Sequence, residues 1–557
     1  MQEETRQCQN CKNAFTIDAS DFAFYDKIKV PPPTFCPDCR LQRRLVLRNE
    51  RALHKRTCGL CKADVIGAYS ERTSFPVYCQ GCWLSDAWDP MTYAKDYDFN
   101  KSFFEQFKEL QDSIPRQHTN NDANTLENSV YTNCSGELKN CYLVFGTIGC
   151  EDSLYSHYLS FSKNCVDNLY SMKNEGCYEC VDIENSYNLF YSQSSVGCRD
   201  SFFLFDCRNC SDCVGCVGLR NKKYHIFNKP HSKEEYIKEK EKLNLNSRVG
   251  VRAFREKFNT EFLYRFPRKY YHGQMNKDFS GDYVSNSENT HKAFYTKNAR
   301  GSKYVFWCVN ALDVYDYFAW GDVERCYEVV SAGYGANNCK FTHTAWSNLR
   351  DTEYSSLCFD SSNLFGCIGL RNKQFCILNK QYTEAEYHNL RKKIIEHMSV
   401  VPYYDKKRNV YVYGENFPIE LAPFPYIDSV AQEHFPMQDE EISASGYQWV
   451  ERGKREYTTT MKGTEVPDTI RRTPDSILDE VIECEHRGEC KDQCTTAFKI
   501  VPAEFQFYKQ KNIPLPALCH NCRHGERIKQ RNPLRLWHRK CQCSGAQSSN
   551  NVYQNTA

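Results

Sequence analysis

Long apolar runs are missing from this 557-residue sequence, and no stretch approaches the roughly 18 residues that a membrane-spanning helix needs. The segment from Met1 to Cys8 also lacks the basic start and apolar core of a secretory signal. We therefore expect a cytoplasmic protein that makes no membrane contact. The net charge is only +2, from 72 basic and 70 acidic side chains, so the chain as a whole does not attract polyanions.

Common catalytic signatures are missing as well. The sequence contains no Walker loop, GxGxxG, GxSxG, HExxH or zinc-deaminase motif. Four aspartates recur at spacings that suit the coils of a solenoid, but turn formation is the commoner role of such residues. They are Asp152, Asp167, Asp182 and Asp200. We expect a protein without enzymatic activity. A solenoid-borne hydrolase or lyase is kept as the third alternative, after the two binding functions described below.

Cysteine, in contrast, is abundant, with 32 residues. In a reducing compartment, paired CxxC spacings indicate metal binding or redox chemistry more often than disulfides. Two such pairs supply the four thiolates of a tetrahedral zinc site, whereas a redox pair usually stands alone. The N-terminal pairs predict two structural Zn²⁺ sites, formed by Cys8, Cys11, Cys36 and Cys39 and by Cys58, Cys61, Cys79 and Cys82.

The two ends of the chain repeat one module. Four cysteines recur at a displacement of 483 positions: Cys11, Cys36, Cys39 and Cys58 become Cys494, Cys519, Cys522 and Cys541. The second copy starts with Cys490-x3-Cys494, which predicts a third zinc site with Cys519 and Cys522. A fourth site is our hypothesis for the cysteines and histidine left over, Cys484, His486, Cys541 and Cys543. The count is therefore three or four structural Zn²⁺ ions.

The middle of the chain is also doubled, at a displacement of 151, and each copy ends in the sequence GLRNK (218–222 and 369–373). A capping box then predicts a helix after each copy, from Ser232 to Glu235 and from Thr383 to Glu386. Upstream, short β-forming triplets alternate with Asn-Cys, Gly-Cys and Asp-Ser turns, a pattern typical of a parallel β-solenoid.

Four interior cysteines resemble an iron–sulfur motif: Cys207, Cys210, Cys213 and Cys216 follow one another at x2 spacing. The second copy has Leu364 at the third of these positions, and leucine does not ligate metal. The duplication therefore favours small thiols that stack as apolar side chains over a metal cluster.

The predicted fold is mainly β with small α/β zinc modules. N-terminal and C-terminal treble-clef or zinc-ribbon modules flank two tandem β-solenoid-like lobes. Within the N-terminal module, the alternations Phe15/Ile17 and Phe22/Phe24 predict hairpin strands, and the second cysteine pair starts a basic helix over about residues 40–56. The expected units are a double zinc-ribbon module (1–95), a helical connector (96–120), the first lobe with its capping helix (121–245), a basic connector (246–275), the second lobe with its capping helix (276–400), a Pro-rich extended connector (401–478), the C-terminal zinc-ribbon module (479–545) and a disordered tail (546–557).

Arginine dominates two basic segments, 40–56 and 523–540, each of which carries seven basic residues and one acidic residue. Guanidinium groups contact phosphates and stack on bases. The leading hypothesis is a zinc-binding scaffold that docks on RNA or a ribonucleoprotein through nine arginines: Arg43, Arg44, Arg48, Arg51, Arg56, Arg527, Arg531, Arg535 and Arg539.

Two other interpretations of these arginines stay open. The protein is a protein–protein assembly scaffold in the first, and its basic face binds protein partners. In the second, the face is solvated or pairs within the molecule with the acidic first lobe, where residues 121–216 carry five basic and thirteen acidic residues.

Several stretches are distinctive enough to compare with known families: Val30–Arg40, Arg48–Cys61, Val77–Asp86, the two GLRNK turns, Ala422–Pro436 and Val501–Cys543. Through them the chain resembles, over nearly its whole length, an uncharacterised multi-zinc-ribbon protein family of candidate-phylum bacteria and giant viruses. Some members carry a CaiB/BaiF-type CoA-transferase label, although this sequence shows no alternating β/α pattern and no CoA-transferase motif. The resemblance implies zinc binding.

Overall fold

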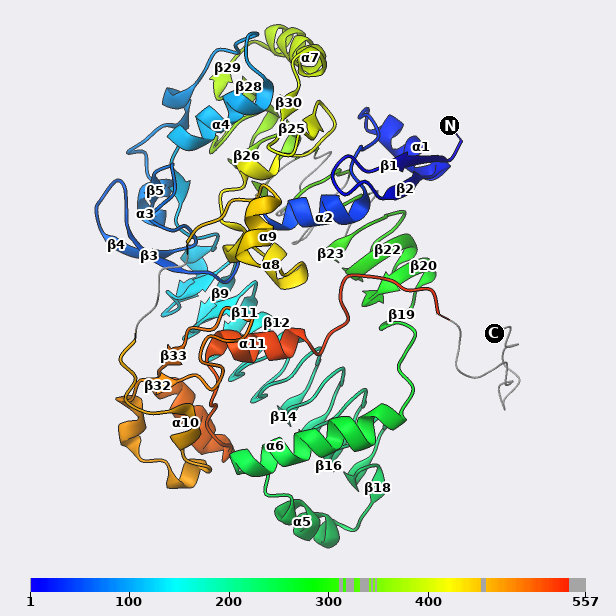
Figure 1. Cartoon of the computed structure of the whole chain (residues 1–557), viewed down its shortest axis with the longest axis vertical. Coiled ribbons are helices and arrows are strands. Elements are labelled where there is room, and N and C mark those ends of the chain that lie inside the picture. Colours follow the sequence, from blue (N-terminus) through cyan, green and yellow to red (C-terminus); the bar gives the residue numbers. More distant parts are fainter. Residues whose placement is uncertain are drawn as a thin grey trace.

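Two stacks of short parallel strands form the body of the molecule, and helices and small hairpins cover them (Figure 1). The computed structural model describes residues 2–309, 314–316, 325–330, 340–341, 344–345, 348–451 and 457–539. Within these ranges, no helix combines the length and the apolar character that crossing a bilayer requires. The expected tail, 546–557, lies outside the described residues.

The first stack spans residues 126–230. Its neighbouring strands pair in parallel, and each partner lies 12 residues further along the chain, as in His157↔Leu169 and Tyr187↔Arg199. Only the last pair, β17 with β18, is antiparallel among its described strands. The strands are β7 (Leu126–Glu127), β8 (Thr132–Asn133), β9 (Gly136–Lys139), β10 (Val144–Phe145), β11 (Ile148–Glu151), β12 (His157–Ser160), β13 (Leu169–Met172), β14 (Tyr187–Phe190), β15 (Arg199–Phe202), β16 (Ser211–Val214), β17 (Lys223–Ile226) and β18 (Lys229–Pro230).

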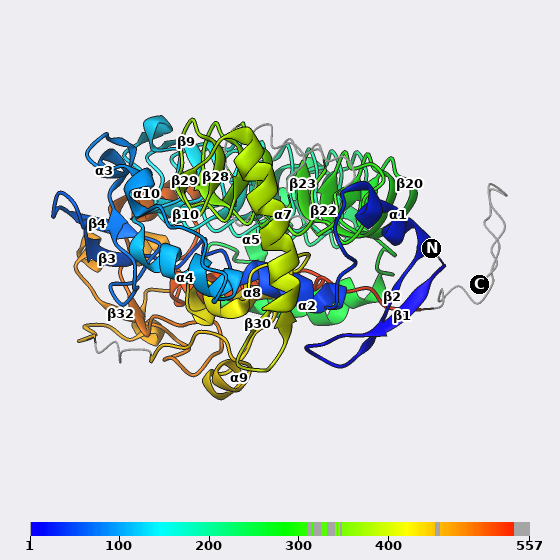
Figure 2. The same cartoon turned by 90° about the horizontal axis from the view of Figure 1, so that it is seen from above.

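The second stack spans 273–381 and repeats this arrangement, with offsets of 11 to 13 residues where its ladder is irregular. Figure 2 shows the strands of both stacks as a row of evenly spaced passes. The strands are β19 (Gly273–Gln274), β20 (Lys277–Asp282), β21 (Val284–Ser285), β22 (Glu288–Lys297), β23 (Phe306–Val309), β24 (Thr344–Ala345), β25 (Arg350–Glu353), β26 (Ser356–Cys358), β27 (Ser362–Phe365), β28 (Gln374–Ile377) and β29 (Lys380–Gln381).

A left-handed residue at every third position bends the first stack. From Asn140 to Phe227 each third residue has a positive φ, between 47° and 69°. Glycine, asparagine and aspartate adopt this conformation most easily, which explains why the turns of the sequence are rich in them. Larger residues also occupy such corners, Tyr155 and Tyr170 among them. The hydrogen bonds between passes, such as those from Val166 and Asp167, offset the cost of this backbone conformation.

Cysteine, serine, asparagine and aliphatic side chains fill the interior of the first stack, again at every third position. Most interior serines and asparagines accept a hydrogen bond from the backbone N–H located 12 residues further on. Ser153 Oγ accepts from Cys165 N at 3.2 Å, and Asn168 Oδ1 accepts from Cys180 N at 2.9 Å. These side chains therefore satisfy backbone donors that would otherwise lie buried without an acceptor.

Helices close the end of each stack, as the capping boxes predict. Ser232 accepts from Glu235 N at the start of α5 (Lys233–Lys242), and Thr383 does the same for α7 (Glu384–Val400). A further helix, α6 (Arg248–Lys257), runs beside the first stack and buries Phe254 against Phe203. It continues into the helical turns η3 (Phe258–Phe262) and η4 (Leu263–Arg265).

The N-terminal module, residues 2–95, begins with the antiparallel hairpin of β1 (Glu4–Gln7) and β2 (Ala14–Ile17). The predicted strand at Phe22/Phe24 is wrong, because these residues lie in α1 (Ala19–Lys27), which an Asp18/Asp21 capping box starts. The basic helix is shorter than expected, because α2 (Pro37–Leu45) ends before Arg48. The remaining elements are β3 (His54–Thr57), β4 (Asp64–Gly67), β5 (Val77–Tyr78), α3 (Gln80–Leu84) and η1 (Pro90–Tyr93).

The connectors also carry regular elements. The segment after the N-terminal module holds α4 (Phe103–Ser113), β6 (Arg116–Gln117) and η2 (Ala123–Thr125). The Pro-rich segment holds β30 (Tyr403–Tyr404), β31 (Val410–Tyr411), η5 (Ile419–Leu421), η6 (Tyr426–Asp428), α8 (Ala431–His434), α9 (Asp439–Ala444), η7 (Gly463–Glu465), η8 (Ile470–Arg472) and η9 (Asp475–Leu478). The C-terminal module, residues 479–539, holds β32 (Ile482–Glu483), β33 (Ala497–Phe498), α10 (Pro502–Lys511) and α11 (His520–Ile528).

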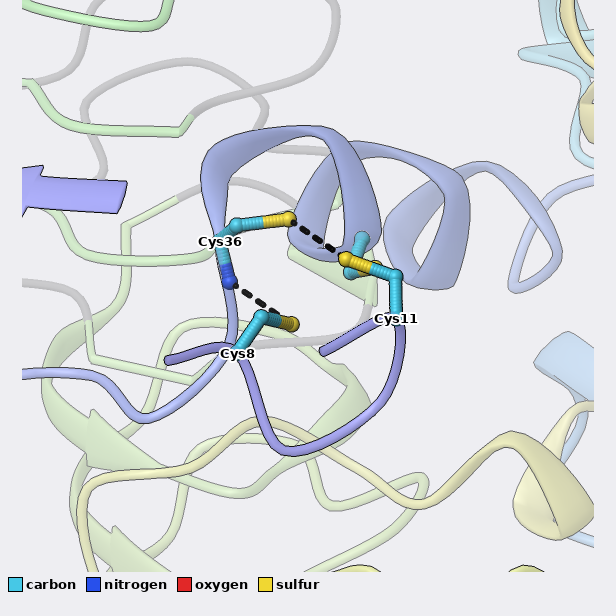
Figure 3. Close-up of side chains that lie close together, drawn as sticks. Cys8, Cys11 and Cys36 are labelled. Carbon is cyan, nitrogen blue, oxygen red and sulfur yellow. Dashed lines mark hydrogen bonds between the residues drawn. The ribbon is translucent and has the colours of Figure 1, made fainter. Parts of the chain in front are cut away.

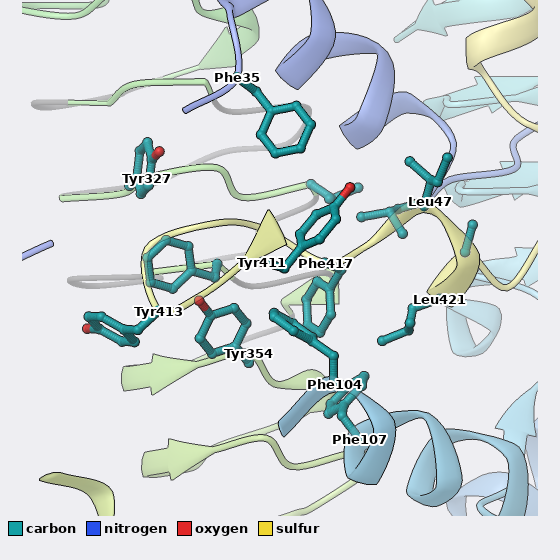
Figure 4. Packing of buried hydrophobic residues seen from close by; sticks show 14 of the residues in the cluster. Phe35, Leu47, Phe104, Phe107, Tyr327, Tyr354, Tyr411, Tyr413, Phe417 and Leu421 are labelled. Atoms are coloured by element: carbon teal, nitrogen blue, oxygen red, sulfur yellow. The ribbon is translucent and has the colours of Figure 1, made fainter. Parts of the chain in front are cut away.

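One large apolar core joins the N-terminal module, α4, the second stack and residues 403–447. Figure 4 shows their rings converging: Phe35 packs against Tyr411 with 5.5 Å between ring centroids, and Phe107 packs against Phe417 at 4.9 Å. A separate core joins the C-terminal module to the first stack. Each module therefore packs on the stack that lies further from it in the sequence.

Candidate metal centres

The first cysteine cluster lies where the β1–β2 hairpin meets α2. Cys8 and Cys11 stand on the turn of the hairpin, Cys36 caps α2, and Cys39 lies in its first turn. The Sγ atoms of Cys11 and Cys36 are 3.7 Å apart, and the backbone N–H of Cys36 donates to Cys8 Sγ at 3.2 Å (Figure 3). This is the predicted set of four, with all its sulfurs within 4.8 Å of one another.

The second cluster repeats this arrangement one hairpin later. Cys58 and Cys61 stand between β3 and β4, and Cys79 and Cys82 begin α3. The Cys61 and Cys79 sulfurs are 3.7 Å apart, and Cys79 N donates to Cys58 Sγ at 3.2 Å. Although burial opposes the shift, backbone N–H groups lower the pKa of the Cys58 thiol to about 6. Donors of this kind favour the thiolate that metal ligation requires.

The third cluster differs from the prediction in one ligand. Its four sulfurs come from Cys484, Cys494, Cys519 and Cys522, so Cys484 takes the place expected of Cys490. The backbone shows why: Cys484 directly follows β32, as Cys8 follows β1, and Cys519 N donates to Cys484 Sγ at 3.3 Å. The turn between the two hairpin cysteines is longer in this copy, which hides the correspondence from a search for CxxC spacing. The two-residue strand Ile482–Glu483, followed directly by Cys484, is the signal that reveals the correspondence.

Cys490 lies beside the third cluster. Its sulfur is 3.4 Å from Cys522 Sγ, and His486, Cys490 and Cys522 form a second group of potential ligands that shares Cys522 with the cluster. Of the hypothetical fourth site, Cys484 is therefore a member of the third cluster, and His486 belongs to the adjoining group. Cys541 and Cys543 lie outside the described residues.

All three clusters suit zinc. In a tetrahedral site with Zn–S bonds of 2.3 Å, the sulfurs lie about 3.8 Å apart. Five of the sulfur–sulfur distances in the clusters lie between 3.4 and 3.9 Å, and all the sulfurs of a cluster lie within 4.8 Å of one another. Four thiols without oxygen ligands exclude calcium and magnesium and favour zinc. Among the residues that the structure describes, three clusters of four cysteines are thus candidate metal centres.

The arginines of α2 do not face solvent. Arg40, Arg43 and Arg44 are at most 2% exposed. Arg40 and Arg44 both pair with Asp316 of the second stack, the latter at 3.3 Å, while Arg43 pairs with Glu328 at 2.6 Å. The N-terminal module therefore docks on the second stack through buried ion pairs.

Helix α11 docks on the first stack in the same way. Arg523 and Arg527 both pair with Asp167, at 2.9 and 2.6 Å. Arg523 also stacks on Tyr155, with its Cζ 4.5 Å from the ring centroid, as Arg40 stacks on Tyr304 at 5.4 Å. Figure 1 shows the two helices beside their stacks.

The two contacts are copies of one another. Arg40 and Arg44 correspond to Arg523 and Arg527 at the displacement of 483 positions. The aspartates also correspond: aligning Cys326-Tyr-Glu with Cys177-Tyr-Glu places Asp316 on Asp167. The duplication has therefore kept both sides of the contact: the arginines of the module and the aspartate of the stack on which the module docks.

The predicted phosphate-binding role does not fit most of the nine arginines, because their charges are engaged inside the molecule. Arg43, Arg44, Arg48 and Arg527 are buried, and the Arg531 side chain is 4% exposed, pairs with Asp182 at 2.9 Å and stacks on Tyr170 and Tyr295. Arg51 and Arg56 are half-buried. Only Arg535 and Arg539 of the nine are exposed. Pairing with the acidic first lobe, the alternative left open above, holds for Arg527 and Arg531, whereas Arg43 and Arg44 pair with the second stack.

The interior cysteines have structural partners. The thiols of Cys207, Cys210, Cys213 and Cys216 each donate to the carbonyl two residues earlier, at 3.2 to 3.6 Å. Asp152, Asp167, Asp182 and Asp200 all occupy left-handed corners of the first stack. Their spacing follows from the turn geometry.

Comparisons with protein-family models, with curated proteins and with solved structures found no match for this chain.

Proposed function

We propose that this protein is a zinc-organised scaffold that performs no catalysis of its own. The two stacks act as β-solenoid lobes, and the terminal modules lock them in place. Support for the lobes comes from the offset between paired strands, 12 residues in the first stack and 11 to 13 in the second, and from the periodic left-handed corners. Support for the zinc comes from the three four-cysteine clusters.

The observation that carries the proposal is the double docking contact. In each module a cysteine cluster fixes the start of the helix whose arginines reach the stack: Cys36 caps α2, and Cys519 caps α11. The metal would thus hold the arginines in the orientation that meets Asp316 or Asp167. A small module with little core of its own depends on metal to keep such an orientation.

Hydrogen exchange of the full chain, with and without a strong chelator, tests this role. We expect chelation to raise exchange in α2 and α11 and then in the strands they cover. The interior of the first stack near Cys207 to Cys216 serves as an internal control, because its hydrogen bonds involve no candidate ligand. Unchanged exchange in both helices after complete metal removal would contradict the proposal.

RNA docking is the second candidate function, and one exposed segment favours it. Residues 531–539 carry the exposed Arg535 and Arg539 together with Trp537, which is 53% exposed and lies with its ring centroid 5.8 Å from Arg535 Cζ. An exposed aromatic ring between arginines suits stacking on a single-stranded base.

Cross-linking in cells, followed by nuclease treatment, separates an RNA partner from a protein partner. If RNA is the partner, Arg535→Glu with Arg539→Glu reduces RNA recovery at least tenfold, whereas the matched change Arg300→Glu on the exposed surface of the second stack does not. Recovery of the same protein partners after nuclease treatment would favour the assembly scaffold.

A further inference from the structure

A mixed histidine–carboxylate cluster lies between the two modules, apart from the cysteine clusters. His157 comes from β12, Glu433 from α8 and His524 from α11. One ring nitrogen of each histidine and one carboxylate oxygen lie within 4.8 Å of one another. His157 is 1% and His524 is 4% exposed, so solvent does not satisfy their ring nitrogens.

His157 is held as a metal-ligating histidine usually is. Its Nε2 lies 2.7 Å from a carboxylate oxygen of Glu50, which fixes the tautomer and the ring orientation. Its Nδ1 is buried and has no hydrogen-bond partner among the described residues. A buried imidazole nitrogen without a partner is costly, and an ion at this place would satisfy it.

The other two side chains have the separation of ligands that share an ion. His524 Nε2 lies 3.2 Å from Glu433 Oε1. Two ligand atoms about 2.1 Å from one metal, at an angle near 100°, lie about 3.2 Å apart. We propose that His157, Glu433 and His524 bind one divalent first-row transition metal, such as Fe²⁺, Mn²⁺ or Zn²⁺.

The ligand types select the class of metal. Two imidazoles and one carboxylate suit first-row transition metals, whereas magnesium and calcium prefer oxygen ligands. Two arginines face the cluster, but each is already paired: Arg48 with Glu50 at 2.5 Å and Arg51 with Glu433 Oε1 at 3.2 Å. The ion and Arg51 would share the Glu433 carboxylate.

The position of the site gives it a distinct role. Its ligands join the first stack, the C-terminal module and the Pro-rich connector, and Glu50 adds the N-terminal module. One ion would therefore tie together segments that the cysteine clusters hold separately. The site is independent of the proposed scaffold function, which rests on the cysteine clusters and the two docking contacts.

Metal content of the reduced, full-length protein tests the site. After saturation with Zn²⁺, we expect three ions in the four-cysteine clusters and one more at this site. His157→Gln and Glu433→Gln should each lower the total by one ion. His434→Gln is the matched control, because His434 is the neighbouring histidine that contributes no ligand to the cluster, and it should leave the total unchanged.

The same samples provide the outcomes that would overturn the site. A wild-type protein that saturates at three ions with Zn²⁺, Fe²⁺ and Mn²⁺ alike would refute it. So would a fourth ion that persists in both variants, or one that Cys490→Ser removes, which would place it beside Cys522 instead.

X-ray absorption of protein loaded with only three equivalents of Zn²⁺, to which one equivalent of Fe²⁺ is then added, gives a reading that does not depend on any variant folding. We expect the iron to show only nitrogen and oxygen neighbours. A sulfur neighbour would assign the iron to a cysteine cluster and exclude the site.

Discussion

Replacing Asp167 with asparagine should weaken the attachment of the C-terminal module more than any other single change of similar size on the first stack. Asp167 is fully buried and pairs with both Arg523 and Arg527. The change keeps the shape and the left-handed backbone, which asparagine tolerates, and removes only the charge. Arg523 retains Glu504, at 3.0 Å, but Arg527 is left without a carboxylate partner among the residues that the structure describes.

Removing one partner of a buried ion pair costs about 3 to 5 kcal/mol, because the remaining charge stays desolvated. We expect a loss in this range, seen in the denaturant midpoint and in faster hydrogen exchange of α11. Asp200→Asn is the matched control: Asp200 occupies an equivalent left-handed corner, is exposed, and accepts a hydrogen bond only from Asn188 among the described residues. A loss below about 1 kcal/mol for Asp167→Asn, or the same loss in the control, would refute the ion-pair account of docking.

Three more predictions follow from individual contacts. Cys484→Ser should remove one bound zinc ion while Cys490→Ser removes none, as elemental analysis of the reduced protein would show; the opposite result would restore the spacing-based assignment. Ser153→Ala should cost about 1 to 3 kcal/mol in equilibrium unfolding, because Cys165 N–H loses its acceptor, and Ser153→Cys should cost less, since a thiol such as Cys141 accepts the same kind of bond. Burial, aided by the nearby charge of Arg56, lowers the pKa of His118 from 6.5 to about 4. The folded protein therefore holds His118 neutral where the unfolded chain would protonate it, so the free energy of unfolding is highest above pH 6.5 and falls by about 3 kcal/mol at most as the pH drops toward 4. His118→Gln should flatten this part of the stability–pH curve, and an unchanged slope would show that other groups cause it.

The sequence predicted the members of two cysteine clusters completely, because a zinc knuckle between paired strands imposes a fixed spacing. The third cluster was predicted with one wrong ligand. There the turn holding the hairpin cysteines is longer, so the local spacing points to Cys490 while the strand ending at Glu483 presents Cys484. Spacing is reliable only where the intervening turn keeps its length.

The capping helices were predicted correctly, whereas the Phe22/Phe24 segment was not. A capping box acts within four residues, so its signal is entirely local. Two alternating phenylalanines are too short a pattern to separate a strand from a helix, and the Asp18 cap decides in favour of the helix. The local signal that did decide was present in the sequence, in the residues just before Phe22.

The arginines were misjudged for a different reason. A basic helix looks the same in sequence whether its charges face solvent or buried carboxylates, because the partners are distant: Arg44 meets Asp316, 272 positions away, and Arg527 meets Asp167, 360 positions away. The regional excess of negative charge in the first lobe did indicate that acidic partners for the arginines exist within the chain. It could not identify which aspartates point toward a helix.

The crossed docking explains why neither half of the duplicated chain is a unit by itself. The N-terminal module precedes the first stack in the sequence but packs on the second, and the C-terminal module packs back on the first. Arg531 reinforces this crossing, since it pairs with Asp182 of the first stack while stacking on Tyr295 of the second. A duplicated pair of module and lobe that docked within its own half would give two independent folding units. Docking across the duplication instead makes the buried charges of each half depend on the presence of the other, and one interlocked body follows from two similar copies.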